Sequence, residues 1–130
     1  DDILIVSGHN LGTAEIESAI DEHPKVCETA IVGFPHDIKG NGIYAFIICH
    51  HKLVNENLIR DEINELVSKT IGPIAKLDKI QFVSGLPKTR SGKIMRRILK
   101  KIAQGDTDNL GDTSTLLDPK IVDEIKLSSL

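Results

Sequence analysis

The sequence of 130 residues predicts a small α+β domain, in which helices pack on a central sheet of about three strands. Some segments repeat apolar residues every three or four positions, which is typical of amphipathic helices. Others are short apolar runs rich in β-branched residues, which is typical of buried strands. These segments alternate along the chain, and a polar tail with a short terminal helix follows. The predicted elements are, in order, helix 13–23, strand 25–34, strand 43–50, helix 55–71, strand 79–84, helix 94–103 and helix 120–127.

The first elements follow a short apolar run and a glycine-bounded loop over residues 1–12. The first helix presents Ile16 and Ile20 on one face; Thr13 can cap its start, and Pro24 ends it. The strand that follows alternates in polarity. A loop with one proline and two glycines separates it from the second strand, whose unbroken apolar run predicts burial on both faces.

The later elements have equally local signals. The second helix presents Ile59, Ile63 and Val67 on one face and ends at a Gly-Pro pair. A third strand leads into the loop 85–93, and the next helix turns its isoleucines and leucine inward and its cations outward. The polar segment 104–119, rich in glycine and aspartate, predicts a tail that follows the surface before the terminal helix.

Composition excludes several classes of protein. No apolar run is long enough to span a membrane, and no signal peptide opens the chain, whose start favours a piece of a longer protein. Cys27 and Cys49 lie in strand-like runs without CxxC spacing, so we expect buried free thiols in a reducing compartment. The five histidines lack metal-ligand spacing, so no metal site built by this chain is expected.

Charge is concentrated in one place. The net charge is −3, yet residues 87–101 contain seven lysines and arginines and no acidic residue. Such a basic element in an acidic body attracts phosphates or carboxylates locally. Nucleic-acid binding is disfavoured, because the patch has no interleaved aromatic residue and matches no known module.

The loop that ends in Gly92-Lys93 suggests phosphate binding. It is not a P-loop, because Pro87 stands where the first glycine belongs and Ile94 where a hydroxyl should hold Mg²⁺. Lys93 is predicted at a helix N-terminus, where the dipole favours an anion and the ammonium can stabilise charge developing on a phosphoryl or carboxylate oxygen. The alternative is a solvated lysine that contributes only to solubility. For Arg96, Arg97, Lys100 and Lys101 a solvated face is the favoured interpretation.

The motif PKTRSGKIMRRILKKIA resembles the C-terminal signature of the adenylate-forming enzymes. Three further stretches, DDILIVSGHNLGTAEIESAI, VGFPHDIKGNGIYAF and GDTDNLGDTSTLLDP, resemble the acetyl-CoA synthetase branch, so the likeness covers nearly the whole chain. This resemblance implies that residues 1–130 form the mobile C-terminal domain of a larger enzyme. That enzyme uses ATP and acetate to form acetyl-adenylate and then transfers the acetyl group to CoA.

The resemblance also implies roles for single residues. Lys93 is the lysine that enters the active site for adenylation. Ser7 and Gly8 line the channel for the pantetheine arm of CoA, where a glycine lets the backbone approach a ligand closely. Asp1 matches the hinge about which the domain rotates between the two half-reactions. Lys93 is also the implied site of regulatory acetylation, by a protein acetyltransferase and with a sirtuin deacetylase reversing it.

The chain departs from the family pattern at two positions. Asn10 replaces an arginine that lies close to the adenylate phosphate in relatives. Ser68 replaces an arginine that often helps to hold the CoA phosphates in bacterial relatives, so either the affinity for CoA is weaker or the neighbouring Lys69 substitutes for it. Glu15, Glu17 and His36 look typical of the family, but no chemistry is assigned to them.

The partners implied are the enzyme's own N-terminal domain and the substrates acetate, CoA and ATP with Mg²⁺, which the absent domain would hold. No nucleic acid or membrane partner is expected. The cytosol is the expected compartment, with the mitochondrial matrix as the alternative. Two other functions remain open: a propionyl-CoA or other short-chain acyl-CoA synthetase, and a stand-alone module that binds anions or a partner through the basic helix.

Overall fold

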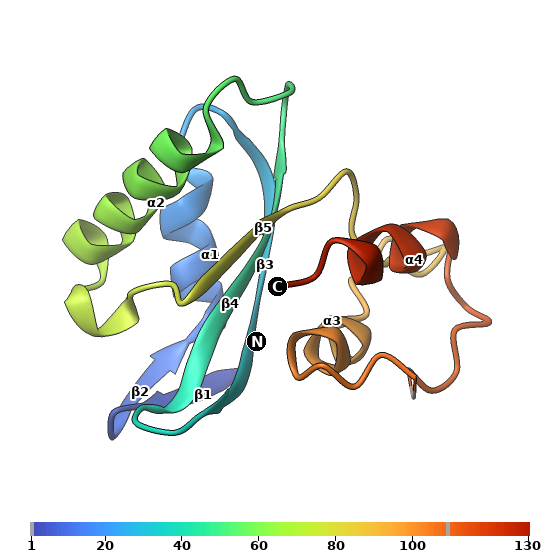
Figure 1. Ribbon diagram of the computed structural model, residues 1–130, viewed down its shortest axis with the longest axis horizontal. Helices are drawn as coiled ribbons and strands as arrows, with labels where there is room; N and C mark the ends of the chain where they lie inside the picture. Colours follow the sequence, from blue (N-terminus) through green and yellow to red (C-terminus); the bar gives the residue numbers. More distant parts are fainter. Residues whose placement is uncertain (1, 109) are drawn as a thin grey trace.

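The computed structural model describes residues 2–108 and 110–130, which form three layers with a sheet in the middle (Figure 1). Helices α1 and α2 cover one face of the sheet, and α3 and α4 cover the other. The helices are α1 Thr13–Asp21, α2 Glu56–Thr70, α3 Arg96–Ala103 and α4 Lys120–Leu127, with a 3₁₀ turn η1 at Pro73–Ala75. The strands are β1 Ile3–Val6, β2 His9–Gly12, β3 Val26–His36, β4 Gly40–Cys49 and β5 Lys79–Phe82.

Strand β4 is the centre of the sheet. One of its edges pairs antiparallel with β3 along its whole length. Its other edge is shared, because β1 pairs with it antiparallel at Val6 and Gly40, and β5 pairs with it in parallel from Tyr44 to Ile47. Strand β2 pairs antiparallel with β1 at the outside. The predicted α+β class is confirmed, but the sheet has five strands rather than about three, because residues 3–12 form a β-hairpin of β1 and β2.

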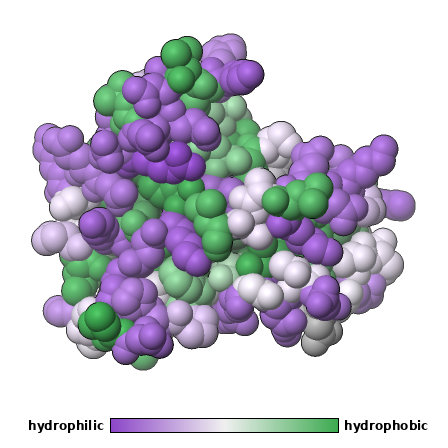
Figure 2. All heavy atoms as spheres, in the orientation of Figure 1, coloured by the Kyte–Doolittle hydropathy of each residue, from purple (hydrophilic) through white to green (hydrophobic). Residues whose placement is uncertain are grey.

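Alternation along the central strands divides the interior into two cores. Ile43 and Ala45 of β4 face α1 and α2, whereas Tyr44 and Phe46 face α3 and α4, and all four are fully buried. The prediction that this run is buried on both faces is therefore confirmed. Polar side chains cover much of α2 and α4 at the two outer sides of the molecule, as Figure 2 shows.

A β-bulge in β3 corrects the prediction for Cys27. Val26 pairs with Cys49 and Glu28 with Ile48, so Cys27 is an extra residue without a partner on β4. The bulge reverses the alternation, which turns Val26 into the α1–α2 core and leaves Cys27 exposed. Cys49 is only half-buried, so the expectation of two buried thiols is wrong for Cys27 and holds in part for Cys49.

The ends of the helices differ from the local predictions at two points. Thr13 does not cap α1: Gly12 occupies the N-cap position, and the Thr13 hydroxyl accepts the backbone N–H of Asp2 at 3.2 Å. Helix α3 begins at Arg96 rather than Ile94, because Ile94 forms an antiparallel bridge with Lys88. The second helix is capped by Asn55, whose side chain accepts the Leu58 N–H. Within the described ranges, no helix is long and apolar enough to cross a membrane.

Candidate functional site

The basic loop is a tight hairpin. Lys88 and Ile94 pair at its base, and the Thr89 N–H donates to the Lys93 carbonyl at 2.9 Å. Gly92 allows the turn with a φ of +86°, a left-handed conformation that favours glycine. The Thr89 hydroxyl accepts the Lys93 N–H at 3.3 Å and lies 2.9 Å from the Ser91 hydroxyl. The backbone on both sides of Lys93 is therefore held in place.

The side chain of Lys93 is exposed at the edge of an open groove of about 660 Å³. The groove is lined also by Asp2, Glu28 and the start of α3. Since α3 begins three residues later, Lys93 does not sit at a helix N-terminus, and its own N–H is already bonded to Thr89. The positive charge that this hairpin presents to the groove is therefore that of the Lys93 ammonium and not that of a helix dipole.

Several neighbouring cations are structural, which corrects the expectation of a solvated basic face. Arg96 forms a two-pronged ion pair with Glu17 of α1, with nitrogen–oxygen distances of 2.5 and 3.0 Å. The Glu17 carboxylate also accepts the N–H of Ile31 in β3 at 2.8 Å. Lys88 pairs with Glu28 at 2.8 Å. These contacts fix the hairpin and α3 against β3.

Arg97 fastens the polar tail instead. Its guanidinium donates to the backbone carbonyls of Leu110 and Asp112, the second at 2.8 Å. The tail also pairs with the hairpin, since the Leu117 N–H donates to the Lys88 carbonyl at 2.8 Å. Lys101 pairs with Asp106 at 3.2 Å. Lys100 is exposed on α3 and fits the predicted solvated face.

Ser7 and Gly8 form the two-residue turn of the β1–β2 hairpin. Both have a positive φ, +49° and +81°, as the two central residues of a type I′ hairpin turn require. Both residues are exposed, and a Cβ on Gly8 would meet nothing within 4 Å. Within this domain Gly8 allows the backbone conformation of the turn, and the space next to its Cα is open to solvent.

The remaining predicted site residues are spread over the fold. Asn10 is exposed on β2, opposite Ile5 of β1. Ser68 and Lys69 lie in the last turn of α2, where Lys69 is exposed. Asp1 lies outside the described residues. Across residues 2–108 and 110–130, no three His, Cys, Asp or Glu gather into a group that could hold a metal ion.

Lys93 and the Ser7–Gly8 turn lie at opposite ends of β1. The Lys93 groove contains Asp2, which precedes the strand, and Ser7 follows its last residue. An extended chain from residue 2 to residue 7 spans about 17 Å. The structure thus brings Ser7, Gly8 and Asn10 together on one hairpin and keeps them apart from Lys93.

Sequence reasoning assigned no role to Glu17 and Glu28, which hold Arg96 and Lys88. No local signal could have found these pairs, because each joins residues at least 60 positions apart.

Residues 15–93, from α1 to Lys93, match the family model of the AMP-binding enzyme C-terminal domain. The chain is 62% identical over 125 residues to the acetyl-coenzyme A synthetase of Novosphingobium aromaticivorans. It is 59% identical over 125 residues to that of Serratia proteamaculans. In both cases the match covers 96% of this chain and 19% of the relative.

Solved structures have the same fold. An acyl-CoA synthetase of Brucella canis aligns with a TM-score of 0.74 and 33% identity, over 85% of this chain and 20% of that one. Apo MatB of Rhodopseudomonas palustris aligns with a TM-score of 0.68 and 27% identity, over 78% of this chain and 20% of that one. The chain spans about a fifth of the length of the relatives it matches. It belongs to the AMP-binding enzyme C-terminal domain family.

Proposed function

We propose that this chain is the C-terminal domain of an acetyl-CoA synthetase, which converts ATP, acetate and CoA into acetyl-CoA, AMP and pyrophosphate. The single observation that carries the proposal is that Lys93 is exposed beside an open groove, on a hairpin that hydrogen bonds hold in place. The relatives' names, at 62% and 59% identity over almost the whole chain, give the reaction. Residues outside this chain would supply the ATP and acetate pockets.

In the first half-reaction, an acetate oxygen attacks the α-phosphorus of ATP, the bond to the leaving pyrophosphate breaks, and acetyl-adenylate forms. Negative charge is redistributed over the phosphoryl and leaving oxygens. A lysine ammonium placed against those oxygens lowers the barrier, because a fixed positive charge stabilises charge that develops in the transition state. Lys93 is the residue we assign to this task, and the hairpin bonds from Thr89 supply the fixed position.

In the second half-reaction, the CoA thiolate attacks the acetyl carbonyl, a thioester forms and AMP leaves. Here we assign the Ser7–Gly8 turn to the wall of the pantetheine channel, with Lys69 near the CoA phosphates. Lys93 and the Ser7–Gly8 turn lie at opposite ends of β1. In one orientation of the domain, Lys93 would therefore face the active site for adenylation, and the turn would lie away from it. A rotation about the hinge that we assign to Asp1 would bring the turn to that site instead.

Acetylation of Lys93 would regulate the first half-reaction. Transfer of an acetyl group to Nζ removes the positive charge. The side chain is exposed, so a modifying acetyltransferase and a sirtuin-type deacetylase would have access to it.

The test separates the half-reactions in the full-length enzyme that carries this domain. Lys93→Ala should reduce acetate-dependent pyrophosphate exchange by about 100-fold or more, while thioester formation from supplied acetyl-adenylate persists. Lys100→Ala, which removes an exposed cation from α3, is the matched control and should leave both rates unchanged. Unchanged exchange in Lys93→Ala would show that Lys93 is a solvated cation.

Two alternatives predict different results. A propionyl-CoA or other short-chain synthetase would show higher kcat/KM with its own acid than with acetate, because residues outside this chain select the acyl group. A stand-alone anion-binding module would exist as a short chain and show neither half-reaction. Its basic surface is reduced by the internal pairing of Arg96 and Lys88, which favours the enzyme.

A further inference from the structure

The turn between β3 and β4 lies directly against the Ser7–Gly8 turn and holds it. The Ser7 N–H donates to the Lys39 carbonyl at 2.7 Å, and the Asn41 side-chain amide donates to the Ile5 carbonyl at 3.0 Å. Val6 also pairs with Gly40. Residues 39–41 thus supply the hydrogen bonds that join the end of β1 to the β3–β4 turn, while Leu4, Val6 and Leu11 anchor the inner face of the β1–β2 hairpin in the first core.

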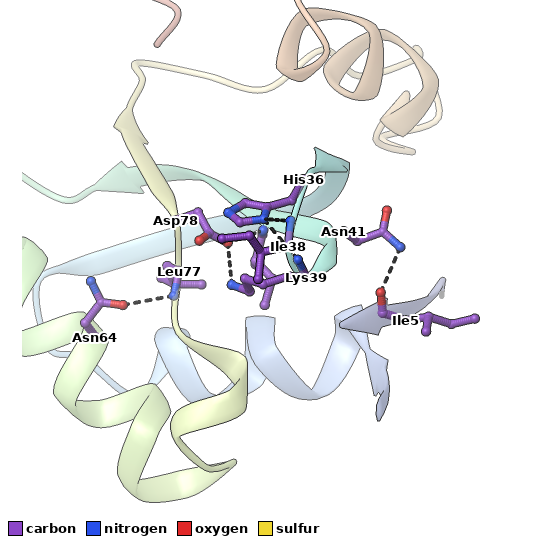
Figure 3. A network of polar contacts seen from close by, with 9 residues as sticks. Ile5, His36, Ile38, Lys39, Asn41, Asn64, Leu77 and Asp78 are labelled. Carbon is purple, nitrogen blue, oxygen red and sulfur yellow. Dashed lines mark hydrogen bonds and ion pairs between the residues drawn. The ribbon is translucent and has the colours of Figure 1, made fainter. Parts of the chain in front are cut away.

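The β3–β4 turn is itself fixed by two side chains (Figure 3). His36 Nδ1 accepts the N–H groups of Ile38 and Lys39, at 3.2 and 3.1 Å, which closes the turn from inside. Lys39 Nζ reaches across to Asp78, 2.7 Å away, at the entry to β5. Only 18% and 21% of these two side chains are exposed, so water screens the pair less than it screens a surface pair.

Asp78 is anchored to the centre of the molecule. Its Oδ2 atom, which pairs with Lys39, also accepts the N–H of Ile43 in β4 at 2.8 Å, and its own N–H donates to the Ile43 carbonyl at 2.9 Å. The preceding Leu77 N–H donates to Asn64 of α2 at 3.0 Å, as Figure 3 also shows. A continuous set of contacts therefore runs from α2, through Asp78 and Lys39, to the Ser7 backbone.

We propose that Lys39 and Asp78 are positioning residues for the CoA half-reaction, since their ion pair sets where the Ser7–Gly8 turn stands relative to α2, which carries Lys69. This inference rests on the proposed function. The backbone carbonyl of Lys39 accepts the Ser7 N–H, and its ammonium binds Asp78. One residue therefore connects the Ser7–Gly8 turn to Asp78. Loss of the ammonium contact frees the carbonyl that orders Ser7.

The test uses the full-length enzyme and measures CoA-dependent thioester formation and acetate-dependent pyrophosphate exchange separately. Lys39→Met keeps the aliphatic stem and removes the charge. It should raise KM for CoA about three- to tenfold, because a small displacement of a binding element weakens binding without touching the chemistry. Pyrophosphate exchange should stay unchanged, since Lys93 lies at the other end of β1. Lys39→Arg, which restores the pair, should return KM toward the native value.

Two further variants make the outcome decisive. Lys52→Met removes an exposed lysine beyond the far end of β4, about 30 Å from Gly40, and should change neither rate. Gly8→Leu probes the turn directly. Its added Cβ would meet no atom within 4 Å, but the φ of +81° strains any residue that has a Cβ, so the melting temperature of each variant is measured beside its KM.

Three other combinations of results would contradict the inference. If Gly8→Leu raises KM for CoA and Lys39→Met does not, the turn binds CoA but the ion pair does not position it. If Gly8→Leu leaves KM unchanged, the proposed CoA site is wrong and the positioning role is lost with it. If Lys39→Met lowers both half-reactions together with the melting temperature, the ion pair serves the fold as a whole.

Discussion

The Tyr44 hydroxyl donates a hydrogen bond of 2.6 Å to the side-chain oxygen of Gln81, and both residues are buried in the middle of the sheet. The same hydroxyl accepts the N–H of Leu130 at 3.0 Å. The Gln81 amide donates to the Ile125 carbonyl and to the Ser128 hydroxyl. This polar group inside the second core therefore fastens α4 and the residues after it to β4 and β5.

Replacing Tyr44 by Phe should destabilise the fold by about 1–3 kcal/mol, because the oxygen of Gln81 loses its buried donor while the ring stays in place. The ring should remain stacked on Phe46, whose centroid lies 4.4 Å away. Urea unfolding of the two proteins measures the difference. A loss below about 0.5 kcal/mol would mean that water replaces the lost contacts.

Stability should fall at alkaline pH in a way that depends on Tyr44. Burial raises the pKa of the Tyr44 hydroxyl above its ordinary value of 10.0. As pH rises past that value, the unfolded state loses this proton before the folded state does. Stability is therefore complete below about pH 10 and declines above it, by at most about 1.4 kcal/mol per pH unit for one proton.

The check compares the free energy of unfolding of the native chain and Tyr44→Phe between pH 9 and pH 11. Titration of the lysines is common to both proteins, so it cancels in the difference. A difference that stays constant with pH would contradict the assignment.

Arg96→Met should cost about 1.5–3 kcal/mol, because Glu17 is left mostly buried without its cation. Lys100→Met is the control on the same helix and should change stability by less than about 0.5 kcal/mol. Chemical denaturation measures both. Equal, small effects would mean that Arg96 belongs to a solvated face after all.

Gly92→Ala should lose about 1 kcal/mol of stability from the φ of +86° alone, since an added Cβ would meet no atom within 4 Å. In the full-length enzyme the strained turn should also slow pyrophosphate exchange. Thermal unfolding and the exchange assay report the two effects separately. A variant with native stability and native exchange would show that the hairpin tolerates another turn.

The two thiols should differ in reactivity. Cys27 is exposed at the bulge, whereas burial raises the pKa of the Cys49 thiol and lowers its thiolate fraction at neutral pH. We expect a disulfide reagent to modify Cys27 at least about tenfold faster at pH 8. Single Cys→Ser variants assign the two rates, and equal rates would contradict the burial of Cys49.

The sequence predicted those helices and strands whose own residues show a clear periodicity or an unbroken apolar run. The face of α2 at Ile59, Ile63 and Val67 and the unbroken run of β4 are such signals, because helical spacing and burial on two faces appear directly in the residue order. The β1–β2 hairpin escaped prediction, because the sequence HNLG has no strand pattern and pairs only through its register with β1.

For the candidate site, the sequence alone determined which residue types stand in the basic loop and that the loop resembles the adenylate-forming enzymes. The tertiary structure decided what each cation does. Arg96 and Lys88 are bound to acids at least 60 positions away, whereas Lys93 stays exposed on its hairpin. Such pairings depend on how helices and strands pack against each other, and no local periodicity records that packing.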